Sequence, residues 1–166
     1  MKRIVLTLMV ISLLSVSSAA FAAGELGIGA ISTPTFGSSV DFSSTPVPCL
    51  RYRFSEKFTG DVALAIASSG DDSAFGLNLR GAISVQKKGG VELLIPIGID
   101  YTSAKIGGGD TVTAFTLKGG FGVETFIKSN FSVAFDLYPI MLVSPSEGDT
   151  TFVLLGGGAI MAHYYL

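Results

Sequence analysis

The last segment of the chain, residues 152–166, has the pattern of a long β-strand that avoids charge on both faces. Its even-numbered positions include Phe152, Leu154, Ile160, Tyr164 and Leu166, and its odd-numbered positions also carry almost no charge. Successive side chains of a strand point to opposite faces, so this segment offers no face suited to water. At about fifteen residues it also exceeds the five or six usual in soluble sheets. The pattern predicts a strand that closes a β-barrel in lipid, with its even-numbered residues facing outward and its odd-numbered residues facing inward.

Seven further segments read as strands because alternating apolar positions lie between clusters of Gly, Ser, Asp and Asn. The eight predicted strands are 24–32, 45–54, 60–68, 75–86, 91–103, 112–127, 131–143 and 151–166. Their connections alternate in length: 33–44 long, 55–59 short, 69–74 medium, 87–90 tight, 104–111 long, 128–130 tight and 144–150 medium. Short turns at the periplasmic end and longer loops at the outer end are typical of outer-membrane barrels. The sequence predicts an all-β protein, an eight-stranded antiparallel up-and-down transmembrane β-barrel.

Charge is confined to one face of the predicted strands. When the large apolar residues define the outward face, the charged residues fall on the inward face: Glu25, Arg51, Arg53, Asp61, Arg80, Glu92, Asp100, Lys118, Glu124 and Asp136. A charge that faces the middle of the bilayer costs a barrel roughly 2 to 4 kcal/mol. A soluble sandwich has the opposite arrangement, with its charges in water. The segregation therefore indicates a lipid-facing exterior.

The predicted interior mixes small residues with long charged ones. An eight-stranded barrel is only wide enough for side chains to fill, so we expect a plugged interior without a wide pore. Buried charges need partners, and we expect a barrel-interior charge network of Arg51, Arg53, Arg80, Glu92, Asp100, Lys118, Glu124 and Asp136. Asp100 and Lys118 are expected to pair, and Arg80 to bind Glu124 or Asp136. Pro96, in the middle of a strand, predicts a bulge or a break in pairing.

The amino terminus has the features of an export signal. Lys2 and Arg3 precede the apolar run 4–14, and Ala20-Phe21-Ala22 resembles a cleavage site. We expect residues 1–22 to be a cleaved signal peptide and residues 23–166 to be one barrel domain. Cleavage removes two of eleven basic residues and none of thirteen acidic ones, which leaves a net charge of −4. No basic patch indicates nucleic acid, and the single cysteine, Cys49, predicts a small buried side chain.

Three segments carry a resemblance to a known family, the small eight-stranded outer-membrane barrels. They are the signal end Ala20-Phe21-Ala22, the glycine-rich alternating stretch 115–126 that leads through the turn 128–130 into 131–136, and the terminal Tyr164-Tyr165-Leu166. That family includes opacity-type proteins and the membrane domain of outer-membrane protein A. The resemblance implies a location in the outer membrane of a Gram-negative-type bacterium, among its lipids and lipopolysaccharide, as a monomer. It also implies that Tyr164 and Leu166 form a terminal signal read by the barrel-insertion machinery, although the family usually ends in phenylalanine.

Candidate chemistry is sparse. A Ser/His hydrolase needs a histidine beside its nucleophile, and His163, the one histidine, lies near the carboxyl end on the inward side. Glu92 and Glu124 resemble an acid/base pair, but charge balance inside a narrow barrel is the more ordinary explanation of both. We expect no cofactor and no metal site, and a non-enzymatic role in envelope structure or surface contact through four external loops. A narrow channel, a lipid A-modifying enzyme and a soluble carrier remain alternatives.

The charges outside the predicted strands differ between the two ends of the barrel. The longer loops carry Asp41, Asp71, Asp72, Lys105, Asp110, Glu147 and Asp149, and the short turns carry Glu56, Lys57, Lys87, Lys88 and Lys128. Acidic loops are able to share divalent cations with lipopolysaccharide phosphates, and lysines are able to meet inner-leaflet phosphates. Ordinary solvated loops explain the same residues.

Overall fold

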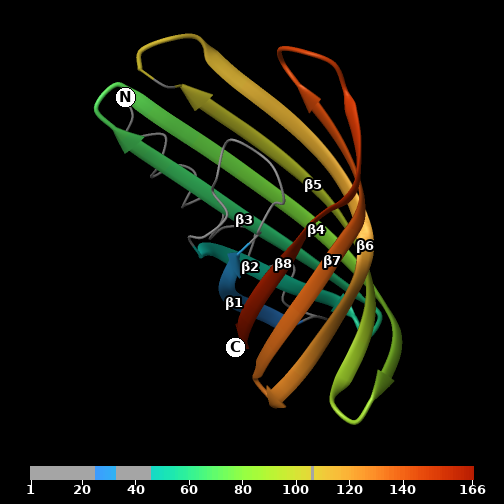
Figure 1. Cartoon of the computed structure of the whole chain (residues 1–166). Helices are drawn as coiled ribbons and strands as arrows, with labels where there is room; N and C mark the ends of the chain where they lie inside the picture. Colours follow the sequence, from blue (N-terminus) through green and yellow to red (C-terminus); the bar gives the residue numbers. More distant parts are fainter. Residues whose placement is uncertain (1–24, 33–45, 106) are drawn as a thin grey trace.

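The computed structural model describes residues 25–32, 46–105 and 107–166, which form a barrel of eight strands (Figure 1). The strands are β1 (Glu25–Ser32), β2 (Val47–Ser55), β3 (Phe58–Ser69), β4 (Asp72–Lys88), β5 (Val91–Lys105), β6 (Thr111–Lys128), β7 (Phe131–Pro145) and β8 (Thr151–Tyr165). The predicted signal peptide and the whole of the predicted loop 33–44 lie outside the described residues. Within the described ranges, no helix is long and apolar enough to cross a membrane.

Each strand pairs antiparallel with its neighbour in sequence, and β8 closes the ring by pairing with β1. Ile28 of β1 lies opposite Tyr164 of β8 in this closing pair. The predicted eight-stranded up-and-down barrel is therefore confirmed, and so is a terminal strand of fifteen residues.

Tight turns and longer connections alternate around the ring, with one exception to the prediction. Two residues join the strands at 56–57, 89–90 and 129–130. The connection 69–74 was expected to be of medium length, but β3 and β4 pair as far as Ser69 and Asp72. Gly70, with a φ of +58°, allows the chain to reverse there. The polar residues around it look like a loop in the sequence, yet they extend the hairpin.

The outer face of the barrel is apolar and the inner face holds the charges. Large side chains such as Ile97 and Phe121 are 54% and 68% exposed on the outside. Of the ten charged residues assigned inward, Glu25 is the exception, since its side chain is 64% exposed at the barrel end. An apolar exterior around a charged interior is the reverse of a soluble fold, and it matches a protein solvated by lipid.

Two prolines interrupt the ladders. Pairing of β5 with β6 stops at Leu94 opposite Gly122 and resumes at Ile97 opposite Gly119, so the break predicted at Pro96 is confirmed. The register of β7 with β8 also shifts around Pro139, because proline has no amide hydrogen to donate.

The shift around Pro139 corrects the alternation expected along residues 152–166. Leu154 and Leu155 both face outward, and Leu155, with a φ of +58°, is 68% exposed. Gly156 was expected to face lipid but faces inward, where an added Cβ would collide with Met141. The even-numbered outward pattern holds again at Ile160 and Tyr164.

Candidate functional site

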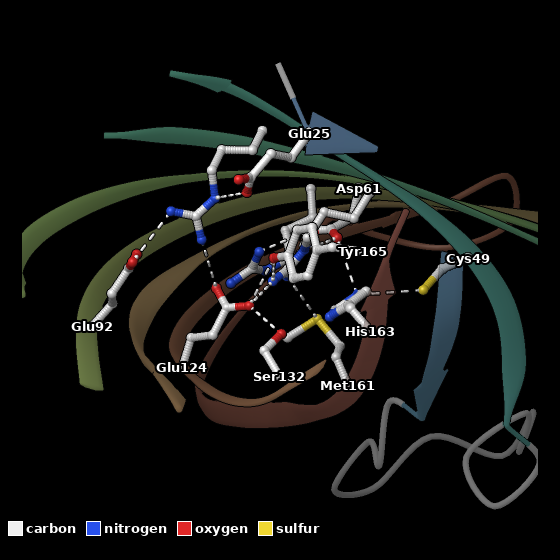
Figure 2. Close-up of polar contacts among 12 residues, drawn as sticks. Glu25, Cys49, Asp61, Glu92, Glu124, Ser132, Met161, His163 and Tyr165 are labelled. Carbon is white, nitrogen blue, oxygen red and sulfur yellow. Dashed lines mark hydrogen bonds and ion pairs between the residues drawn. The ribbon is translucent and has the colours of Figure 1, made fainter. Parts of the chain in front are cut away.

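The middle of the barrel is crossed by ion pairs between opposite walls, which we call the central layer: Arg51, Asp61, Arg80, Glu124 and Asp136 (Figure 2 shows part of it). Arg51 of β2 reaches across to Glu124 of β6, with 2.5 Å between Nη1 and Oε1. The same guanidinium binds Asp61 of β3 through Nε at 2.6 Å and Nη2 at 3.1 Å. Both contacts come from inward positions of their strands, so alternation alone aims the side chains into the lumen.

Arg80 of β4 completes the central layer. It donates to Asp136 of β7 through Nε at 2.5 Å and Nη2 at 2.9 Å, and to Asp61 through Nη1 at 2.7 Å. Asp136 was one of its two predicted partners; Glu124, the other, binds Arg51 instead. The five side chains of the layer are at most 1% exposed.

Three hydroxyl groups donate further hydrogen bonds to two of the central carboxylates, Glu124 and Asp136. Ser132 and Tyr165 donate to Glu124 Oε1 at 2.6 and 3.0 Å, and Tyr138 donates to Asp136 Oδ2 at 2.8 Å. The sequence-based network included neither these hydroxyls nor Asp61, although Asp61 was assigned to the inward face. The alternation along each strand could have shown that these residues face inward, as the predicted charges do. It could not show which inward residues meet, because that depends on the stagger between strands.

A second group of charges lies nearer the end with the short turns. Arg53 Nη1 lies 3.2 Å from Glu92, and Lys87 Nζ lies 2.8 Å from the same carboxylate. The Arg53 guanidinium also lies 5.1 Å from the ring centre of Phe126, which stacks on Tyr165. Cation–π contacts of this kind contribute about 0.5 to 2 kcal/mol. Arg53 and Glu92 therefore close the barrel below the central layer.

A third group lies toward the end with the longer loops. Lys118 Nζ lies 2.6 Å from Asp100, the pair expected from the sequence, and Asn78 donates to the same carboxylate. The ammonium group also lies 4.8 Å from the ring centre of Tyr138. Gly98, opposite Lys118, leaves room for the lysine stem, since a Cβ there would lie 2.6 Å from Cε.

His163 has the surroundings of a structural residue. It is fully buried, and its Nε2 lies 3.5 Å from Cys49 Sγ and 3.3 Å from Asp61 Oδ1. A catalytic triad uses one ring nitrogen for the nucleophile and the other for the carboxylate, whereas here both neighbours face the same nitrogen. Asp61 is moreover bound to Arg51 and Arg80. Cys49 is buried, as expected.

The remaining candidates also have structural surroundings. Glu92 and Glu124 lie opposite each other on β5 and β6, and each is bound by an arginine. Among the described residues, no group of three His, Cys, Asp or Glu side chains is placed to hold a metal ion.

Tyr164 lies near the carboxyl end of β8, and Leu166 follows the last residue of that strand. Both side chains face outward, 48% and 75% exposed, and the Leu166 amide donates to the Leu26 carbonyl at 2.9 Å. Their role as an insertion signal stays a prediction.

Comparison with known proteins finds similarity in structure alone. No protein-family model matches the chain, and no curated protein matches its sequence. Among solved structures, outer membrane protein W of E. coli is similar with a TM-score of 0.52 and 14% identity, covering 88% of this chain and 100% of that one. Ail, the attachment invasion locus protein of Yersinia pestis, is similar with a TM-score of 0.50 and 13% identity, covering 86% and 96%. The chain therefore has the fold of the small eight-stranded outer-membrane β-barrels.

Proposed function

We propose that this protein is an integral barrel of a Gram-negative-type outer membrane that acts without catalysis, in envelope structure or surface contact through its external loops. The observation that carries the proposal is the central layer. Its ion pairs join β2 to β6 and β4 to β7 across the lumen with buried side chains. A solute would have to break several charge-assisted hydrogen bonds to pass, and each such bond contributes about 1.5 to 3 kcal/mol.

The apolar exterior supports the membrane part of the proposal. Outward side chains on every strand are large and apolar, and the inward charges are paired. Contiguous apolar surface of this extent on a soluble protein would cause aggregation, whereas lipid solvates it. An alternating pattern of this kind, with the charges inside, suits a barrel that spans the bilayer.

The loops at the outer end are the parts left to make contacts. The described residues of these loops and of the adjoining strand ends are acidic at Asp71, Asp72, Asp110, Glu147 and Asp149 and basic at Lys105. The hairpins β3–β4, β5–β6 and β7–β8 extend beyond the short strands β1 and β2 (Figure 1). An acidic rim beside lipopolysaccharide phosphates favours contacts bridged by divalent cations. Binding and catalytic residues of rigid scaffolds are commonly found on such loops.

Two measurements on the purified, refolded protein test the proposal. Electrophoresis with and without boiling is expected to give two mobilities, since a barrel stable in lipid stays folded in detergent until it is heated. Planar bilayers are expected to show no stepwise conductance. Release of the protein from membranes without detergent would refute the membrane assignment. Discrete channel openings would refute a closed interior and favour a transport function.

A separate measurement tests the absence of catalysis. His163→Gln is expected to leave the lipid A of the host unchanged relative to the wild-type protein, as judged by mass spectrometry of extracted lipid. A lipid A change that depends on the wild-type protein and disappears in the variant would establish an enzyme.

A further inference from the structure

The end of the barrel with the short turns contains a basic cavity of about 1020 Å³. Its lining includes four cationic side chains, Arg53, Lys57, Lys87 and Lys128, and two acidic ones, Glu25 and Glu56. The lysines come from the β2–β3 turn and from the ends of β4 and β6, so three separate hairpins converge on it. The excess of cations favours an anionic occupant.

The cations of this cavity differ in how far they are neutralised by the protein. Arg53 faces three carboxylates, at 3.2 Å from Glu92, 3.7 Å from Glu25 and 3.9 Å from Glu124. Lys87 is bound to Glu92 but remains 61% exposed. Within the described part of the chain, Lys57 and Lys128 have no ion-pair partner. These two lysines are therefore the cations free to bind an anion.

An apolar groove of about 410 Å³ adjoins the cavity on the outer surface of the barrel. Leu93, Phe121, Val123 and Leu137, on the outward faces of β5, β6 and β7, line it. Val85 lines both the groove and the basic cavity. It is the residue at which the β4–β5 register shifts, and its side chain is 56% exposed. The basic and apolar sites therefore meet at one residue.

We propose that this composite site binds an anionic phospholipid of the inner leaflet, with its phosphate near Lys57 and Lys128 and an acyl chain along the groove at Val85 and Phe121. The inference rests on the proposed function, which places the short turns at the periplasmic face of the outer membrane. A soluble phosphate would make no contact with the apolar groove, and a neutral lipid would gain no attraction from the lysines. The adjacency of the two favours a charged lipid.

The electrostatic contribution sets the size of the expected effect. A lysine close to an anionic membrane surface increases the affinity by about fivefold. Replacement of both free lysines is therefore expected to weaken binding by about 25-fold. Since the interaction is between exposed charges, it is also expected to weaken as salt is raised.

The test uses the full refolded chain in detergent and native mass spectrometry with added lipid. Dioleoyl phosphatidylglycerol is expected to remain bound, dioleoyl phosphatidylcholine to bind weakly, and dihexanoyl phosphatidylglycerol to bind less well because its chains are too short for the groove. Lys57→Gln/Lys128→Gln is expected to reduce phosphatidylglycerol binding about 25-fold. Lys105→Gln, at the opposite end of β5, is the matched control and is expected to bind as the wild type does.

Three results would overturn the inference. Equal binding of phosphatidylglycerol and phosphatidylcholine would show that the site does not select for lipid charge. Unchanged binding by the double variant would show that Lys57 and Lys128 do not bind the phosphate. Displacement of phosphatidylglycerol by millimolar inorganic phosphate with no effect of chain length would indicate a site for soluble phosphate. The boiling assay on the same samples reports folding separately, so loss of the two mobilities marks failure of the barrel and not of the lipid site.

The leaflet assignment is tested in intact cells. A membrane-impermeant amine reagent is expected to leave Lys57 and Lys128 unlabelled until the outer membrane is permeabilised. Labelling before permeabilisation would place the short turns outside and refute an inner-leaflet site, while leaving the barrel itself intact.

Discussion

Arg80 is the residue whose removal should cost this barrel the most stability. It makes three charge-assisted hydrogen bonds, two to Asp136 and one to Asp61, from a fully buried side chain. In Arg80→Ala, Asp61 keeps Arg51 as a partner. Among the described residues, the Tyr138 hydroxyl is then the one side-chain donor left to Asp136. Removal of one partner from a buried ion pair typically costs about 3 to 5 kcal/mol. The folding equilibrium is therefore expected to shift by roughly 150-fold to 5,000-fold.

Urea titration in phospholipid vesicles measures this effect. The chain has no tryptophan, so the folded fraction is read from the mobility of unboiled samples and from circular dichroism. Arg53→Ala is the comparison variant, because its buried carboxylate partners keep other cations: Glu92 keeps Lys87 and Glu124 keeps Arg51. It is expected to cost about 1 to 3 kcal/mol.

A second variant separates the loss of pairing from the loss of volume. Arg80→Leu/Asp136→Leu removes both charges, and replacement of a buried ion pair by apolar residues is often neutral or stabilising. The double variant is expected to be more stable than Arg80→Ala. The reasoning would be refuted if Arg80→Ala lay within about 1 kcal/mol of the wild type, below the cost of an unpaired buried charge, or if the double variant were the less stable of the two.

Three further predictions concern packing, the lipid face and the buried thiol. Gly120→Ala is expected to destabilise the barrel by about 1 to 3 kcal/mol in the same urea titration, because its Cβ would collide with the Leu137 carbonyl. Gly119→Ala is the control and should be nearly neutral, because its Cβ would meet nothing within 4 Å. Ile97→Arg, on the outer face, is expected to cost about 2 to 4 kcal/mol in vesicles, and a neutral result would argue against lipid around β5. Cys49 is 4% exposed, so a maleimide should label it after boiling and not before; rapid labelling of the folded protein would show that the interior opens.

The arrangement of the interior shows where sequence reasoning succeeded and where it stopped. Alternation assigned Arg51, Arg80 and Asp136 to one face, and proximity on adjacent strands was enough to pair Asp100 with Lys118. It could not decide between Glu124 and Asp136 for Arg80. That choice depends on the stagger of β4, β6 and β7 around the closed ring, which no local pattern encodes.

The effect of Pro139 is a second feature that the hydrophobic pattern does not determine. The sequence shows that proline must disturb a ladder, but two neighbouring strands are able to absorb the disturbance. The structure places it in β8, where Leu155 and Gly156 change faces. The expected facing of those two residues was wrong. The alternation was counted along β8 alone, and it could not include a register shift caused by the neighbouring strand β7.

The sequence by itself determined the strand number, the topology and the outward apolar face, because these follow from a period of two residues and from the position of turns. Only the tertiary structure decided that Asp61 joins Arg51 to Arg80, that both neighbours of His163 face one ring nitrogen, and that a basic cavity meets an apolar groove at Val85. The physical reason is closure. Contacts within a strand or hairpin are local, whereas contacts across the lumen depend on the tilt and stagger with which all eight strands meet.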